Sequence, residues 1–234
     1  MQLQLYMWEG TRRIFLDAHR FYVDQLKTRL LAQFHDIEGQ TDRFAEEAYE
    51  RIGSSPGHGD VDMSDAAEWA YDEAASHYLA LTELRKQVLL GGLAGMYHQF
   101  DKQLREFIER EMLHYVDHEW TDTHVWKPGG DKVLDILGEF GWRVKSLPFY
   151  PLLGALQLVV NVYKHGKGRS LNELSDRYAR FVASPVKAAG YGEWRTTLDH
   201  EWLTVTDDHF DEFADAISDF WSAMPERLYC DVTK

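Results

Sequence analysis

Apolar residues recur at every third or fourth position along most of the chain, which is the spacing of one face of a helix. The first such stretch runs from Thr11 to Ile52 and predicts one long helix, or two in line with a break near Gly39. The second runs from Ser64 to Met112 and contains the pair Gly91-Gly92, where we expect a kink or a break. Because the Gly- and Pro-rich segment between the two stretches is short, we expect the long helices to pack antiparallel.

The remainder of the chain has shorter periodic segments. Residues His118 to Gly130 lack helical spacing and end in Lys-Pro-Gly-Gly, which predicts a surface loop. Three short helices are expected to begin at Asp131, at Pro151 and, through a capping box, at Ser170. A last amphipathic helix is expected from Asp207 to Met224, and residues 196–198 and 202–205 fit a small β-hairpin.

These patterns predict an all-α protein, built as an up-and-down helical bundle around two long antiparallel helices. No internal repeat or linker divides the chain, so we expect a single domain over residues 1–234. Two aromatic stripes are expected in its core rather than on a binding surface. They are Phe21, Tyr22 and Phe34, and Phe210, Phe213, Phe220 and Trp221.

Charge and cysteine content exclude several function classes. The formal net charge of −14 disfavours binding of long duplex DNA through a broad basic face. Cys230 is the only cysteine among 234 residues, so neither an intrachain disulfide nor a Cys-rich zinc site is expected. No signal peptide and no run of about 18 apolar residues is present, which predicts a cytoplasmic protein without a membrane span.

The segment from Asn161 to Ser170, NVYKHGKGRS, carries the strongest candidate chemistry. Asn161 and His165 are four residues apart and share a helix face, beside three cations: Lys164, Lys167 and Arg169. In one interpretation the cations bind a phosphate and His165 acts as acid or base. In the other, Gly166 ends the helix, and Lys164 and His165 only complement its dipole. Both interpretations stay open at this point.

A second pair of polar residues has the spacing of metal ligands. His114 and His118 stand four residues apart, as in helical zinc motifs, but the sequence identifies no third ligand. These histidines also suit the end of a helix because of its dipole. We therefore expect no metal and no cofactor.

The order of motifs resembles the HEPN superfamily of helical bundles. The resemblance covers Leu90 to Phe181 and is carried by the helical segment AGMYHQFDKQL, from Ala94 to Leu104, and by the N-x-x-K-H-G ending at Gly166. It implies a HEPN-like core over about 90–182, with a helical extension over 183–234. It also implies a homodimer, in a bacterial defence or toxin-antitoxin system.

Active HEPN proteins are metal-independent ribonucleases that use an arginine and a histidine separated by four to six intervening residues. The positions that would hold this arginine before His165 are Leu158, Val159 and Val160, so the family's catalytic arginine is absent. The resemblance therefore implies either a nuclease-inactive protein that binds RNA, or an atypical endoribonuclease. In the second case Asn161, Lys164 and His165 would be catalytic, and Lys167 and Arg169 would bind RNA.

An alternative comes from a different class of function. The aromatic-rich helices could bury against another protein, so that the chain is a non-enzymatic interaction or scaffold module. This alternative predicts that His165 packs against its own chain and that a large apolar patch is exposed.

Overall fold

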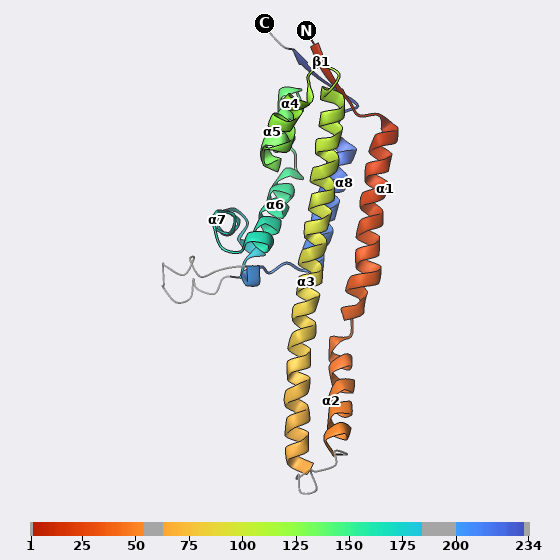
Figure 1. Ribbon diagram of the computed structural model, residues 1–234, viewed down its shortest axis with the longest axis vertical. Coiled ribbons are helices and arrows are strands. Elements are labelled where there is room, and N and C mark those ends of the chain that lie inside the picture. The colour runs from red at the N-terminus through yellow and green to blue at the C-terminus, as the bar shows by residue number, and fades with distance from the viewer. Residues whose placement is uncertain (1, 54–62, 184–199, 232–234) are drawn as a thin grey trace. The chain divides into compact units, whose positions relative to one another are not determined.

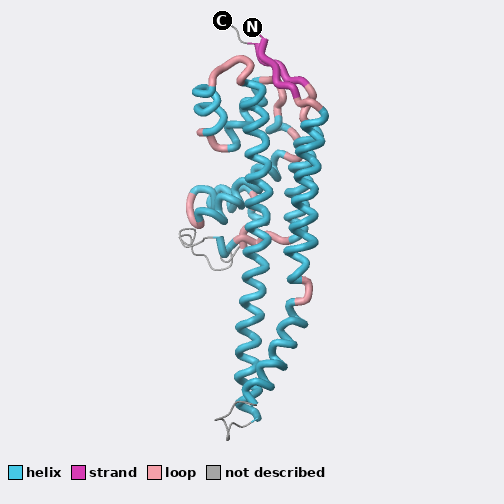
Figure 2. The backbone as a smooth tube through the Cα atoms, turned by 45° about the vertical axis from the view of Figure 1, so that its right-hand side comes forward, coloured by secondary structure: helices cyan, strands magenta, loops and turns pink. Residues whose placement is uncertain are grey.

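The structure of the protein is a computed structural model, which describes residues 2–53, 63–183 and 200–231. These residues are mostly helical (Figures 1 and 2), which confirms the all-α prediction. They group into two compact units, one with Met1–Val23 and Leu90–Lys234 and the other with Asp24–Leu89. The single domain over 1–234 stays a prediction.

The helices and strands follow one another along the chain with short connections. In order they are β1 (Gln2–Tyr6), α1 (Glu9–Gln25), the π-helix η1 (Leu26–Leu30), the 3-10 helix η2 (Leu31–Phe34), α2 (Ile37–Gly53), α3 (Met63–Met112), α4 (His118–Thr121), the π-helix η3 (Asp122–Trp126), α5 (Gly130–Glu139), η4 (Val144–Ser146), α6 (Tyr150–His165), α7 (Arg169–Arg177), η5 (Ala179–Phe181), η7 (His200–Trp202), α8 (Asp207–Ala223) and β2 (Arg227–Asp231).

In the unit Asp24–Leu89, α2 runs antiparallel to the first part of α3. The ring of Phe44 stacks on that of His77 with centroids 4.2 Å apart, and Arg51 forms an ion pair with Glu73. The predicted break lies just before α2, where the Asp36 carboxylate accepts a hydrogen bond from the backbone N–H of Gly39 at 3.0 Å. An aspartate at this position satisfies an N–H group that the helix itself leaves unpaired, so α2 begins here.

In the other unit, α1 runs antiparallel to the second part of α3. The Tyr22 hydroxyl donates to the Gly92 carbonyl at 2.9 Å, and the Tyr6 N–H donates to the Glu111 carboxylate at 3.1 Å. A Cβ at Gly95 would lie 2.2 Å from the Tyr22 hydroxyl, so this close approach requires glycine. The expected break at Gly91-Gly92 is wrong, because α3 is one continuous helix from Met63 to Met112.

Helix α8 is the centre of the core in the larger unit, where it packs against α1, α3 and α6 (Figure 1). The apolar stripe predicted for it is buried, including Phe220 and Trp221. Phe100 of α3 meets Phe220 edge to face, with centroids 4.9 Å apart. On the α1 side, the buried His19 donates from Nε2 to the Ala214 carbonyl at 2.8 Å. Burial lowers the pKa of His19, and a neutral imidazole suits this core position.

The chain ends pair as a two-stranded antiparallel sheet that the sequence analysis did not predict (Figure 2). In its register Leu3 lies opposite Cys230, and Leu5 lies opposite Leu228. Leu3 and Leu5 are buried while the residues between them are more exposed, as alternation along a strand requires. Each strand has five residues and its partner lies at the other end of the sequence, so the local pattern gave little signal.

Two further predictions differ from the structure or lie partly outside it. The loop expected over His118 to Gly130 is wrong for most of its length, because α4 and η3 occupy residues 118–126. Asp117 starts α4 by accepting a hydrogen bond from the Trp120 N–H at 2.9 Å. The first arm of the expected β-hairpin, residues 196–198, lies outside the described residues. In the second arm, Leu203 forms an isolated antiparallel bridge with Val182.

Candidate functional site at the end of α6

Helix α6 positions the predicted site residues on its last turns. Pro151 in its first turn and the apolar run that follows form a helix that is buried on several sides. Asn161 is half-buried, whereas Lys164 and His165 are exposed. In the described parts of the chain, neither Asn161 nor His165 makes a side-chain hydrogen bond or ion pair. The exposed position of His165 disagrees with the interaction-module alternative, which expected it packed against its own chain.

The glycines in KHGKG form a tight turn between α6 and α7. Gly166 and Gly168 have φ angles of 68° and 148°, in the region that side chains avoid, and Gly166 caps the C-terminus of α6 as predicted. The capping box expected at Ser170 is wrong, because the N-cap of α7 is Gly168 and no side chain caps this helix. The turn places Lys167 and Arg169, both exposed, directly after the end of α6.

The start of α7 adds positive potential to this region. The first N–H groups of any helix lack partners within the helix, and here the capping residue is a glycine without a side chain. Such groups bind anions readily, since the helix dipole also favours negative charge at this end. Lys167 and Arg169 lie at the same helix start. These residues therefore form a region suited to a phosphate group.

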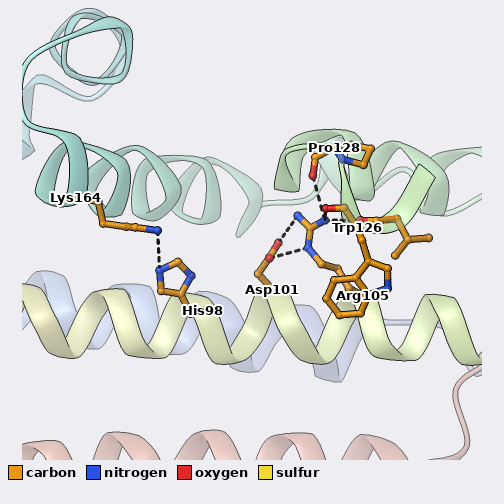
Figure 3. A network of polar contacts seen from close by, with 7 residues as sticks. His98, Asp101, Arg105, Trp126, Pro128 and Lys164 are labelled. Atoms are coloured by element: carbon orange, nitrogen blue, oxygen red, sulfur yellow. Dashed lines mark hydrogen bonds and ion pairs between the residues drawn. The ribbon is translucent and has the colours of Figure 1, made fainter. Parts of the chain in front are cut away.

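His98 of α3 lies against Lys164, a contact that the sequence analysis missed (Figure 3). The Lys164 ammonium donates to His98 Nε2 at 3.4 Å, in the imidazole tautomer that carries its proton on Nδ1. Partial burial and then the charge of Lys164 lower the pKa of His98, while Asp101 opposes the shift. His98 is therefore a neutral imidazole at neutral pH. It lies within the segment that carries the HEPN resemblance, but its distance from Lys164 in sequence hid the pairing.

One helical turn further along α3, a buried ion pair holds the neighbouring segment in place (Figure 3). Arg105 is only 7% exposed, and its guanidinium donates to both carboxylate oxygens of Asp101, at 2.7 and 3.0 Å. Its guanidinium also donates to three backbone carbonyls, those of Val125, Trp126 and Pro128. Because every one of these contacts is internal to the fold, Arg105 fixes the η3 segment and is not a candidate for ligand binding.

A cleft between α3, α5 and α6 lies apart from the predicted residues. Its volume is about 300 Å³, counting the part open to solvent, and neither Asn161, His165 nor the KHGKG cations line it. Tyr150 and Asp131 both line this cleft, and the Tyr150 hydroxyl donates to the Asp131 carboxylate at 3.0 Å. Burial and then this hydrogen bond raise the pKa of Tyr150, so the hydroxyl keeps its proton.

Among the described residues, His114 and His118 have no third side chain beside them that could complete a metal site. His118 is exposed and its Nδ1 lies 3.8 Å from the Glu109 carboxylate. No group of three or more His, Cys, Asp or Glu side chains in residues 2–53, 63–183 and 200–231 has the geometry to hold a metal ion. His114 follows the end of α3 and His118 is the first residue of α4, so the two histidines do not share one helix as a helical zinc motif requires.

Large apolar side chains are exposed on the long helices. Those on α1, η1 and α3 are Ile14, Phe21, Leu30, Trp69, Tyr71, Tyr78, Leu79 and Leu84. The core position predicted for Phe21 is wrong, because this side chain is 67% exposed. Single exposed apolar residues are normal on a protein surface, so the large apolar patch of the interaction-module alternative stays a prediction.

No protein-family model, curated protein or solved structure matches this chain. The HEPN resemblance therefore rests on the residues from Leu90 to Phe181 and remains a proposal. Of the helices within the described ranges, none is both long enough and apolar enough to pass through a bilayer.

Proposed function

We propose that this chain is a HEPN-like protein that binds RNA at the turn between α6 and α7, in a bacterial defence or toxin-antitoxin setting. The observation that carries the proposal is the exposed cluster of Lys164, Lys167 and Arg169 beside the uncapped start of α7. In a chain with a net charge of −14, such a cluster is a local site for phosphate. The choice of RNA over other phosphates rests on the family resemblance.

RNA binding is tested by removing the three cations together. In Lys164→Gln/Lys167→Gln/Arg169→Gln we expect the affinity for a labelled single-stranded RNA of mixed sequence to fall at least tenfold. The slope of log affinity against log salt concentration should become less negative by about 2, because each phosphate contact contributes about 0.7 to this slope on single strands. Fluorescence anisotropy over a salt series measures both quantities.

The matched control makes the same change in charge elsewhere on the surface. Lys102, Lys132 and Arg227 are exposed residues away from the turn between α6 and α7. The variant Lys102→Gln/Lys132→Gln/Arg227→Gln should bind RNA within about twofold of the wild type, since local contacts and not net charge set the affinity. Equal losses in the two triple variants would show that binding is nonspecific and would refute the proposed site.

A second candidate function, metal-independent RNA cleavage, is favoured by the pair of His98 and Lys164. Neutral His98 would accept the proton of a ribose 2′-hydroxyl as the 2′-oxygen attacks phosphorus. Lys164, turned from His98 toward the phosphate, would stabilise the charge that develops there. The bond from phosphorus to the 5′-oxygen breaks, and that oxygen takes a proton from the imidazolium form of His165. The products are a 2′,3′-cyclic phosphate and a 5′-hydroxyl.

Cleavage is tested in the presence of a metal chelator with end-labelled RNA. Because general acid-base catalysis contributes about 10²–10⁴-fold, His98→Ala and His165→Ala should each lose at least about 100-fold in rate while RNA binding is kept. The wild-type rate should rise as the pH increases through the pKa of His98, which lies below its ordinary value of 6.5. His124→Ala, at an exposed histidine of η3, is the control. Cleavage that persists in His98→Ala would exclude His98 as the base.

A further inference from the structure

The exposed face of α1 combines opposite charges in a regular order. Arg13, Asp17, Arg20 and Asp24 lie within an arc of about 60° on the helix, since successive residues are turned by about 100°. All four side chains belong to exposed residues. Along the helix the charges therefore read plus, minus, plus, minus at spacings of four, three and four residues.

This order is complementary to itself when it is reversed. If a second copy of α1 lies antiparallel on the first, Arg13 falls opposite Asp24 of the second copy, and Asp17 falls opposite Arg20 of the second copy. A two-fold axis repeats each pairing, which gives four contacts between opposite charges and none between like charges. Isologous dimer interfaces require such a self-complementary patch.

Apolar side chains flank the charged stripe with the same symmetry. Ile14 and Phe21 are 63% and 67% exposed and, at seven residues apart, lie on one side of the stripe. In the antiparallel arrangement Ile14 of each copy lies beside Phe21 of the other copy. Burial of two large apolar side chains from each copy supplies attraction that the charged stripe alone does not.

Within one chain the contacts of the stripe are exposed ones, and Asp24 accepts a hydrogen bond from the Gln25 side-chain amide at 2.8 Å. Arg20 and Asp17 approach to 3.8 Å with both side chains more than 60% exposed, a contact that water screens strongly. Two copies that each carry a net charge of −14 repel at long range, but at physiological salt this repulsion is screened beyond about 8 Å. The local order of charges therefore decides whether the two faces attract.

We propose that the exposed face of α1, formed by Arg13, Ile14, Asp17, Arg20, Phe21 and Asp24, binds the same face of a second copy of this chain in antiparallel orientation. The argument uses the charges and exposure of α1 only, so it holds or fails independently of RNA binding. It predicts a homodimer whose orientation is set by the charge order.

The test reverses one charge at a time and then mixes the products. At micromolar concentration and physiological salt, sedimentation should give the wild type twice the mass of the 27.3 kDa chain. Asp17→Arg and Arg20→Asp should each weaken self-association at least tenfold, because each places like charges opposite one another twice. Mixed in equal amounts, the two variants should form a heterodimer, since every contact between them is again between opposite charges.

Two controls complete the experiment. The double variant Asp17→Arg/Arg20→Asp should dimerise like the wild type, because its charge order is again self-complementary. Lys102→Glu, a reversal on α3, should leave the dimer unchanged. A monomeric wild type, single variants that still dimerise, or single variants that fail to associate on mixing would each overturn the proposal.

Discussion

Replacing Arg105 by alanine is expected to lower the free energy of unfolding by about 3 kcal/mol or more. The guanidinium is buried and bridges Asp101 of its own helix to three backbone carbonyls near the end of η3. Its removal leaves the Asp101 carboxylate without its counter-charge and orphans the carbonyls, and both effects are costly away from water. Urea denaturation followed by circular dichroism measures the change.

The control for this prediction is the neighbouring exposed ion pair. Lys102 and Glu106 approach to 3.6 Å, but their side chains are 69% and 51% exposed. Lys102→Ala should therefore change the free energy of unfolding by less than about 1 kcal/mol. If Arg105→Ala costs no more than Lys102→Ala, the internal contacts of Arg105 do not stabilise the fold and its assignment as a structural residue is wrong.

Phe220→Ala is expected to cost about 3–5 kcal/mol, the range for removing a buried phenylalanine. The ring is fully buried and has four aromatic neighbours, three from other parts of the fold and one, Trp221, from the next position of α8. They are Phe100, Trp142, Phe149 and Trp221, with ring centroids between 4.9 and 6.2 Å from that of Phe220. The surrounding rings cannot all collapse into the space, so a cavity remains.

The matched control for Phe220 is an apolar side chain on the surface. Leu79 of α3 is 66% exposed, so Leu79→Ala removes little buried area and should change stability by less than about 0.5 kcal/mol. Thermal unfolding at equal protein concentration compares the two variants. A small loss in Phe220→Ala, comparable to that in Leu79→Ala, would contradict the placement of α8 at the centre of the core.

The site and the fold were predictable to different degrees for a physical reason. The last turn of α6, its Gly166 cap and the cations that follow could be located from sequence, because local spacing and glycine conformation determine them. The contact between His98 and Lys164 could not, since it joins two helices whose register is set by core packing. The same holds for Arg105, whose carbonyl partners lie in a segment expected to be a loop.

Exposure was the property that sequence periodicity predicted least well. Phe21 and Phe220 both belong to aromatic stripes at helical spacing, yet Phe21 is on the surface and Phe220 is in the core. Periodicity shows that a helix has an apolar face, but it does not show whether that face meets another part of the same chain. A face left uncovered is available to a partner, as we propose for the exposed face of α1.

The sequence by itself determined the all-α class, the two long helices and most of the shorter ones, because helical spacing, caps and glycines act within a few residues. Tertiary structure alone decided which faces are buried, the pairing of the two chain ends as β1 and β2, and the meeting of His98 with Lys164. These features depend on contacts between residues far apart in the chain. Their free energy comes from packing and pairing of whole elements, which no local pattern records.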